Sequence, residues 1–343
     1  MIVLGIETSC DDTAAAVLAG GRLRSSIVSS QDAVHGPYGG IVPELASRHH
    51  LTNILAVVHA ALEQAGVGLA DLEGIAVTRG PGLVGSLLVG LSAAKGIAFA
   101  RGIPLVGVNH LEGHMLAIFL EQPIEFPYVA LLVSGGHTSL YLAESLGRYR
   151  RIGATRDDAA GEAFDKAAKM LDLGFPGGRR IDDLARSGNR SAIRFPRASV
   201  RGAKYDFSFS GLKTSLREFL RRETGSDGSS LSTKKPPNGF SGALADVAAS
   251  FQEAIVDMLV EPTFAAAREL GVSTIVVSGG VSANSRLRSR MREEARARGV
   301  EVHVPSPRFC TDNAAMIAYA GAQRLARSEQ DPLTLNAVAA LPL

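Results

Sequence analysis

The segment TIVVSGGVSAN (residues 274–284) decides the fold, because an apolar strand pattern ends there in a glycine turn. A helix and a short strand at residues 301–304 are expected to follow. An equivalent series begins at GIAVTRGPGLVG (residues 74–85), where a helix and a strand at residues 103–108 are expected. The chain therefore repeats one structural plan, and this repeat is the sequence feature that most restricts its architecture.

Three strand patterns precede that glycine turn in each half of the chain. They lie at residues 2–6, 13–18 and 24–30, and again at residues 128–133, 138–143 and 149–153. A meander followed by a turn, a helix and another strand gives the same βββαβα order twice. This duplicated α/β plan, with glycine turns facing a central cleft, resembles the two-lobed actin, Hsp70 and sugar-kinase superfamily (the ASKHA, ribonuclease H-like fold).

The length and composition of the chain are typical of a protein with two lobes. With 343 residues, of which 46% are hydrophobic and 20% charged, the chain can bury a large core. We expect the first lobe at residues 1–125, completed by a C-terminal helix at about residues 312–343, and the second at residues 126–311. Residues 223–242, rich in Ser, Gly, Lys and Pro, are expected to form a flexible insert in the second lobe.

The N-terminal and apolar segments do not indicate secretion or a membrane span. The first residues lack the basic region that starts a signal peptide. The longest apolar window, residues 82–100, contains Lys95 and follows a Gly-Pro-Gly turn, so a buried helix is expected there. Two cysteines, Cys10 and Cys310, suit a reducing compartment. These features predict a cytoplasmic protein that does not bind a membrane.

The candidate metal ligands are the two histidines of HLEGH (residues 110–114). Side chains four residues apart on a helix lie about one turn apart, so His110 and His114 can reach one metal ion. The same spacing also occurs on ordinary polar helix faces. If the halves of the chain pack about a pseudo-twofold axis, the ends of the repeated strands bring Asp312 to the same place as a third ligand.

Two kinds of turn carry further candidates. The hairpin turn after residue 7 contains Asp11 and Asp12, which can act as a base or simply face solvent. The glycine pairs in residues 134–136 and 278–280 let backbone N–H groups approach phosphate oxygens, or they only permit a turn. Neither pattern decides the function alone.

A basic stretch lies at residues 186–222. It contains ten Lys or Arg residues and two acidic residues, in a chain whose formal net charge is +2. The aromatic residues interleaved with these charges are Phe195, Tyr205, Phe207 and Phe209. The pattern predicts a surface for a polyanion, and the alternative is a solvated helix face.

Seven motifs, in order along the chain, resemble those of the tRNA N6-adenosine threonylcarbamoyltransferase family (TsaD and YgjD proteins), formerly called O-sialoglycoprotein endopeptidases. They are GIETSCD (5–11), HGPYGGIVPELASRH (35–49), NHLEGH (109–114), LVSGGHT (132–138), EAFDK (162–166), FSFSGLK (207–213) and VSGGVSAN (277–284). The resemblance extends from about residue 2 to residue 319. The sequence SGGHT is similar to the bacterial and organellar branch.

The resemblance implies an acyltransferase that moves the threonylcarbamoyl group from L-threonylcarbamoyladenylate to N6 of adenosine 37 in tRNAs reading ANN codons, releasing AMP. It implies one divalent metal ion per subunit, Fe²⁺ or alternatively zinc. It also implies a noncatalytic paralogue (TsaB-like) and a small ATPase (TsaE-like) as partners besides tRNA. The basic stretch would then hold the anticodon arm, so reversing the charges of Arg194 and Arg197 is expected to weaken tRNA binding in a salt-dependent way.

The resemblance also implies roles for individual residues. His110, His114 and Asp312 would hold the metal, and Asp11 would be the catalytic carboxylate. The substrate-binding residues that it implies are Leu132, Val133, Ser134, Gly135, Gly136, Asp165, Gly178, Asp182 and Asn284. The chain has Asp12 where the family usually has Glu, so the choice of base between two neighbouring carboxylates stays open. Leu132 stands where another branch has a metal-binding Tyr.

Three other classes of protein compete with this interpretation. A zinc protease needs the pattern His-Glu-x-x-His, whereas Glu112 is displaced from it by one position. An ATP-dependent phosphotransferase or ATPase of the same superfamily would not need a histidine metal site. A noncatalytic scaffold would lack His110 and His114. The sequence therefore favours the transferase.

Overall fold

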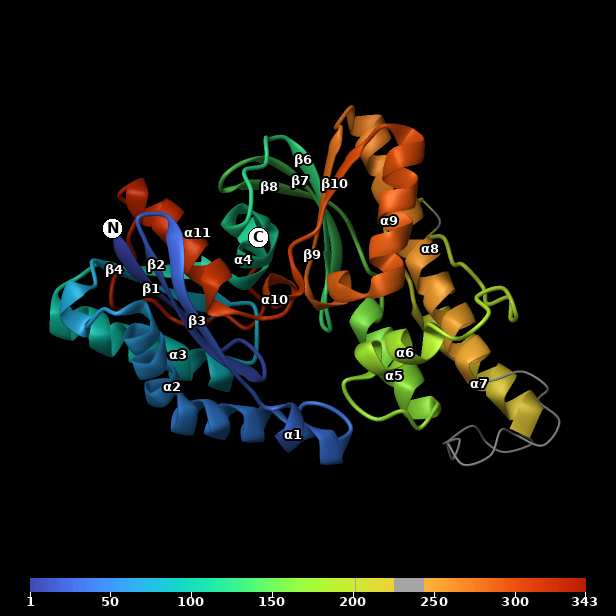
Figure 1. Ribbon diagram of the computed structural model, residues 1–343, viewed down its shortest axis with the longest axis horizontal. Helices are drawn as coiled ribbons and strands as arrows, with labels where there is room; N and C mark the ends of the chain where they lie inside the picture. The colour runs from blue at the N-terminus through green and yellow to red at the C-terminus, as the bar shows by residue number, and fades with distance from the viewer. Residues whose placement is uncertain (201, 225–243) are drawn as a thin grey trace. The chain divides into compact units, whose positions relative to one another are not determined.

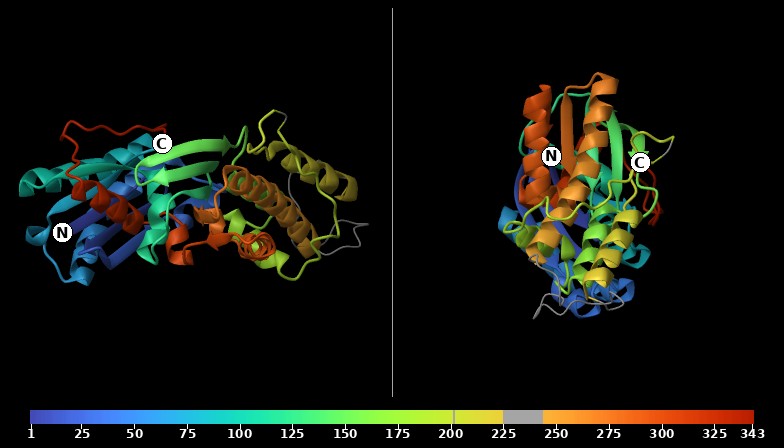
Figure 2. Two further views of the ribbon diagram at one scale, coloured as in Figure 1. Left: turned by 90° about the horizontal axis from the view of Figure 1, so that it is seen from above. Right: turned by 90° about the vertical axis from the view of Figure 1, so that its right-hand side faces the viewer.

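The computed structural model describes residues 1–200, 202–224 and 244–343. These residues form two compact units, residues 1–124 with 305–343 (unit 1) and residues 125–304 (unit 2). Each unit contains one five-stranded mixed sheet with helices packed on it (Figures 1 and 2). Most of the insert expected at residues 223–242 lies outside the described residues.

The sheet of unit 1 has the strand order β3-β2-β1-β4-β5. Its strands are β1 (Ile2–Glu7), β2 (Asp12–Ala19), β3 (Arg22–Ser30), β4 (Gly74–Gly80) and β5 (Leu105–Asn109). The first three form an antiparallel meander, and β4 and β5 run parallel to β1. Because β1, β4 and β5 are parallel, their carboxyl ends lie at one edge of the sheet, and β5 leads there directly into the histidine helix.

The helices of unit 1 come from both ends of the chain. They are α1 (Asp32–His35), α2 (Pro43–Ala65), α3 (Val84–Arg101), α4 (His110–Leu116), α10 (Pro307–Cys310) and α11 (Ala314–Ala326), with short 3-10 turns at Gly36–Tyr38, Leu69–Asp71 and Ala117–Leu120. Helix α11 lies close to the sheet because Gly321 has no side chain: a Cβ atom there would be 2.2 Å from the Cβ of Ala76. The residues that directly precede α11 form part of the site described below.

Unit 2 repeats the topology of unit 1, with the order β10-β9-β6-β7-β8. Its strands are β6 (Tyr128–Val133), β7 (Thr138–Ser145), β8 (Arg148–Ala154), β9 (Thr274–Ser278) and β10 (Glu301–His303). Its helices are α5 (Ala160–Met170), α6 (Gly177–Ala185), α7 (Ser210–Thr224), α8 (Leu244–Leu270) and α9 (Ser285–Arg298), with a 3-10 turn at Gly280–Ala283. The duplicated α/β plan predicted from the glycine turns is confirmed.

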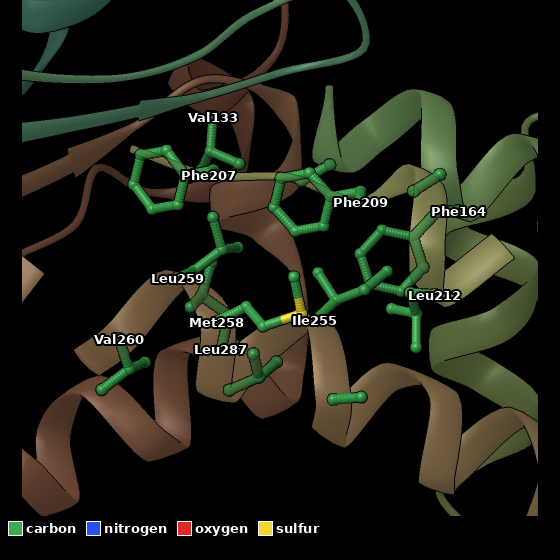
Figure 3. Packing of buried hydrophobic residues seen from close by; sticks show 14 of the residues in the cluster. Val133, Phe164, Phe207, Phe209, Leu212, Ile255, Met258, Leu259, Val260 and Leu287 are labelled. Carbon is green, nitrogen blue, oxygen red and sulfur yellow. The ribbon is translucent and has the colours of Figure 1, made fainter. Parts of the chain in front are cut away.

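Aromatic residues of the basic stretch belong to the core of unit 2. Phe207 and Phe209 point toward Ile255 and Leu259 of α8 (Figure 3), and Phe195 contacts Phe251 of the same helix. All three phenylalanines are at most 2% exposed. The prediction that these rings accompany the arginines on a nucleic-acid surface is therefore wrong, because a segment that packs across a helix must bury its apolar side chains.

Helix α3 occupies the apolar window noted in the sequence. Among the described residues it is the one helix long and apolar enough to cross a membrane, and a third of it is buried. Leu87, Leu91 and Ala94 are buried, whereas Val84 and Leu88 are exposed. The expected buried helix is therefore buried on one face only.

Candidate functional site

Helix α4 carries the two candidate histidines directly after β5. Asn109 caps the helix, and its side-chain oxygen accepts a hydrogen bond from the backbone N–H of Leu111 at 2.9 Å. His110 and His114 are both buried, and their ring centroids lie 4.7 Å apart. The cap and the burial hold both imidazoles in place.

Asp312 lies in the same unit, two residues before α11. Its Oδ1 atom is 3.1 Å from Nε2 of His114 and 3.5 Å from Nε2 of His110. Asn313 caps α11 by accepting a hydrogen bond from the backbone N–H of Met316, which fixes the chain next to Asp312. The structure thus brings together the three side chains predicted from the sequence to lie at one place.

The geometry of this group fits a divalent metal ion. One ligand atom from each of His110, His114 and Asp312 lies within 4.8 Å of the other two. Ligand atoms bonded to a tetrahedral ion at about 2.1 Å lie about 3.4 Å apart, a value that falls between the two separations measured above. Two imidazoles and one carboxylate suit zinc and non-haem iron, and three protein ligands leave a position for water or substrate. The group could therefore hold a metal ion.

One carboxylate of this site, Glu7, was not among the residues predicted from the sequence. It ends β1 and is fully buried. Its Oε2 atom lies 2.9 Å from Nδ1 of His110 and accepts a hydrogen bond from the Thr78 hydroxyl at 2.6 Å. Burial raises the pKa of Glu7, but the neighbouring His110 outweighs burial and lowers it. An acidic residue ending an otherwise apolar, buried strand is the signal that identifies it.

The hairpin turn between β1 and β2 places two more carboxyl groups beside Asp312. Burial raises the pKa of Asp11, and the negative charge of Asp312 raises it further. Burial, Asp312 and Asp11 together raise the pKa of Asp12 to about 8. The Oδ1 atom of Asp12 is buried and, within the described chain, lacks a hydrogen-bond partner. The raised pKa makes Asp11 a stronger base than an exposed aspartate.

His50 of α2 holds the hairpin turn from the other side. Its Nε2 atom lies 2.9 Å from the backbone carbonyl oxygen of Cys10, which can only accept a hydrogen bond, so Nε2 donates. Its Nδ1 atom lies 2.8 Å from the Thr13 hydroxyl. Burial lowers the pKa of His50, which favours the neutral ring that can donate at one nitrogen and accept at the other. Helix α2 therefore fixes the backbone next to Asp11.

The stability of the metal-free protein is expected to fall as the pH rises from about 6 to 9. Burial lowers the pKa of His110, but Asp312 and Glu7 outweigh burial and raise it to about 9. For His110 and Asp12 alike, the folded pKa lies above the unfolded value, so the stabilising contribution is complete below the unfolded pKa and is lost as the pH passes the folded one. Urea unfolding across this range measures the effect, and Asp12→Asn should flatten the slope. A stability that rises with pH would contradict this assignment.

The other predicted substrate residues lie in unit 2, around the glycine turns and helix starts. Leu132 and Val133 end β6 with buried side chains, so only their backbone can meet a ligand. In the turn that follows Ser134, a Cβ atom on Gly135 or Gly136 would meet nothing within 4 Å, which leaves open space there. Leu132, Val133, Gly135 and Gly136 can therefore contact a ligand through their main-chain groups.

Three further predicted residues form hydrogen bonds at helix starts, two of them at α9 and one at α6. Asn284 caps α9 through the backbone N–H of Leu287 at 3.0 Å. Asp182 of α6 accepts hydrogen bonds from the hydroxyl and backbone N–H of Ser285 at 2.7 and 3.1 Å. Asp165 of α5 accepts one at 2.7 Å from the backbone N–H of Gly177, next to Gly178. The structure thus joins Asp182 to Ser285, the residue after Asn284, and Asp165 to the start of α6.

The basic stretch contains both paired and unpaired arginines. Arg197 donates to Asp257 from Nε at 3.1 Å and from a terminal nitrogen at 2.9 Å. Arg194 is exposed and has no ion-pair partner in the part of the chain that the structure describes. Arg197 is therefore a structural residue, and Arg194 is the better probe of binding.

Sequence comparison relates the chain to a family of known proteins. Residues 22–319 match the family model described as tRNA N6-adenosine threonylcarbamoyltransferase. Curated relatives with that name include one from Geotalea uraniireducens, 53% identical over 100% of this chain and 97% of its own length. Another, from Anaeromyxobacter dehalogenans, is 55% identical over 98% of this chain and 97% of its own.

Solved structures share the fold at low identity. The chain is similar to T. kodakarensis HypF with a TM-score of 0.64 and 15% identity, over 95% of this chain and 48% of that one. It is also similar to the activator of 2-hydroxyisocaproyl-CoA dehydratase from Clostridium difficile, with a TM-score of 0.52 and 14% identity, over 97% and 99% of the two chains. These structures support the ASKHA-type fold, and the sequence relatives decide the family. The chain belongs to the tRNA N6-adenosine threonylcarbamoyltransferase family, whose members are transferases.

Proposed function

We propose that this enzyme transfers the threonylcarbamoyl group of L-threonylcarbamoyladenylate to N6 of adenosine 37 in tRNAs reading ANN codons and releases AMP. The observation that supports the proposal best is the convergence of buried His110 and His114 with half-buried Asp312, with Asp11 beside them, in a member of this family. The N6 nitrogen attacks the carbonyl carbon of the donor, a C–N bond forms, and the C–O bond to the phosphate of AMP breaks. AMP leaves with the electron pair of that bond.

Different residues of the protein have different roles in this reaction. We propose that His110, His114 and Asp312 hold one Fe²⁺ ion per subunit, with Zn²⁺ as the alternative. Such an ion polarises a carbonyl oxygen or orients the donor. Asp11 takes the proton that N6 loses during attack, because an exocyclic amine is too weak a nucleophile to react well without a base. The main-chain groups of residues 132–136, together with Asp165, Gly178, Asp182 and Asn284, bind the adenylate.

Nucleoside analysis of tRNA tests this function. Purified protein loaded with Fe²⁺ is incubated with tRNA and L-threonylcarbamoyladenylate, alone and with the noncatalytic paralogue and small ATPase of the same cytoplasmic system. We expect threonylcarbamoyladenosine and an equal amount of AMP. If tRNA stays unmodified while the purified protein by itself hydrolyses added ATP, the phosphotransferase or ATPase alternative replaces this proposal. Cleavage of a protein substrate would instead favour the metalloprotease.

Charge reversal of Arg194 and Arg217 together is expected to weaken tRNA binding about tenfold or more near 0.1 M salt and to reduce its salt dependence. Phe195 packs against Phe219 of α7, which places Arg194 in the same region as the exposed Arg217 of that helix. Filter binding across a salt series measures both effects. Arg148→Glu, an exposed reversal on β8, is the control. Equal weakening by the control would contradict a tRNA surface on the basic stretch.

Leu55→Glu is expected to prevent association with the noncatalytic paralogue while leaving metal binding unchanged. Leu51 and Leu55 of α2 are 69% and 72% exposed, and Val84 and Leu88 are exposed on α3, which packs against α2. Exposed apolar side chains on two packed helices suit an interface between related chains. Light scattering of the mixed proteins measures association. Phe99→Glu, at the far end of α3, is the control, and an intact Leu55→Glu complex would exclude this surface.

A further inference from the structure

Hydrogen-bond donors lie next to both carboxylate oxygens of Glu7, at the end of β1. Its Oε1 atom accepts a hydrogen bond from the backbone N–H of Ser9. Its Oε2 atom accepts from the Thr78 hydroxyl at 2.6 Å and lies 2.9 Å from Nδ1 of His110. Because a buried carboxylate surrounded by donors is favoured in its ionised form, Glu7 is a fixed acceptor.

This acceptor decides which nitrogen of His110 carries the hydrogen. An ionised carboxylate cannot donate, so Nδ1 of His110 must be the donor toward Glu7. The other nitrogen, Nε2, lies 3.5 Å from Asp312 and offers its lone pair to a metal ion once it has lost its proton. The Ser9 hydroxyl, 3.1 Å from the same Nδ1, can share that hydrogen but can also donate, so it does not fix the tautomer.

Among the described residues, His114 lacks a hydrogen-bonded carboxylate at Nδ1 like the one that supports His110. The Nε2 atom of His114 is 3.1 Å from Asp312, and its Nδ1 atom is buried and lacks a hydrogen-bond partner among the described residues. The two imidazoles lie on one helix, but among the described residues the Nδ1 atom of His110 has a carboxylate partner and the Nδ1 atom of His114 has none. A carboxylate behind a metal-bound imidazole orients the ring and increases its basicity.

We propose that Glu7 is a positioning residue of the metal centre: it holds His110 in the Nδ1–H tautomer, strengthens Nε2 as a ligand, and supplies the negative charge that, with Asp312, balances a divalent ion. This inference rests on the metal site of the proposed function. It makes His110 the firmly held histidine ligand and His114 the one whose bond to the ion depends on helix packing alone.

Metal affinity, measured without reference to catalysis, tests this role. Apo-protein carrying Glu7→Gln is titrated with Zn²⁺ in competition with a chromophoric chelator, beside the wild type and Ser9→Ala. Removing a carboxylate behind a histidine ligand is expected to weaken binding about 10- to 100-fold. Ser9→Ala, which keeps Glu7, should change affinity less than about threefold by the same argument. Circular dichroism of each apo-protein checks that it is folded.

The outcomes separate this inference from the metal site itself. If wild type fails to bind Zn²⁺ at one ion per chain, the proposed metal centre is wrong. If wild type binds and Glu7→Gln binds equally well, only the role of Glu7 is overturned. The same follows if Ser9→Ala is as damaging as Glu7→Gln.

A measurement on the wild-type protein covers the case in which Glu7→Gln does not fold. Long-range ¹H–¹⁵N correlation spectra of the Zn²⁺-loaded protein report the state of each histidine nitrogen. For His110 we expect a protonated Nδ1 with slow solvent exchange and a metal-bound Nε2. A His110 ring bound through Nδ1, or an Nδ1 hydrogen that exchanges as fast as that of an exposed histidine, would overturn the inference.

Discussion

Replacing His114 with alanine is expected to abolish stoichiometric metal binding and, with it, threonylcarbamoyl transfer. The side chain supplies one of three ligand atoms that converge from α4 and from the segment before α11. Loss of a direct ligand should cost more than the 10- to 100-fold typical of an outer hydrogen-bond partner, so affinity should fall by more than about 100-fold. Metal content by mass spectrometry after dialysis measures this directly.

Two companion variants make the result specific. Asp312→Asn keeps the shape of the side chain but removes its charge, and it should lose metal to a similar extent. His59→Ala removes an exposed histidine of α2 in the same unit and should bind metal normally. Treatment of wild type with a chelator should reproduce the inactive state, and added Fe²⁺ should restore it. Retention of the metal by both His114→Ala and Asp312→Asn would disprove this centre.

The second large effect is expected from Asp11→Asn, which should lower kcat about 10²- to 10⁴-fold while leaving metal binding intact. The variant removes the proposed proton acceptor but keeps a side chain of the same size in the turn held by His50. Single-turnover transfer of threonylcarbamoyl to tRNA measures the chemical step. Unlike the ligand variants, this enzyme should still contain one ion per chain.

Asp12→Asn is the matched control for that prediction. Burial, Asp312 and Asp11 raise the pKa of Asp12 to about 8, so its carboxyl group is largely protonated in the metal-free protein near neutral pH. Burial, the largest cause of this raised pKa, does not depend on the metal, and asparagine imitates the neutral form that burial favours. The change in kcat should therefore be well below that of Asp11→Asn. The opposite ranking would assign the base to Asp12 and decide the choice between the two carboxylates.

The sequence was sufficient for the fold because the decisive information is local. Glycine turns after apolar strands, such as the one at Gly279 with φ of 90°, mark where a strand must end and a helix can begin. The same pattern in both halves predicted the shared topology of the two sheets. Helix spacing likewise placed His110 and His114 on one short helix.

Contacts between distant parts of the chain could not be predicted in this way. Glu7 contacts His110, which lies 103 positions away along the chain, and His50 contacts Cys10, which lies 40 positions away. The arginines and phenylalanines of residues 186–222 alternate in sequence, but only packing against α8 shows that the rings face inward while Arg194 stays exposed. Pairing of Arg197 with Asp257 is also a long-range contact and was not visible in the charge pattern.

Anomalous diffraction from crystals of the Fe²⁺-loaded protein, recorded on both sides of the iron edge, tests the central claim most directly. We predict one iron peak per chain, about 2.0–2.2 Å from Nε2 of His110, Nε2 of His114 and a carboxylate oxygen of Asp312. A peak bound elsewhere, or a fully loaded protein in which Asp312 is not a ligand, would contradict this account.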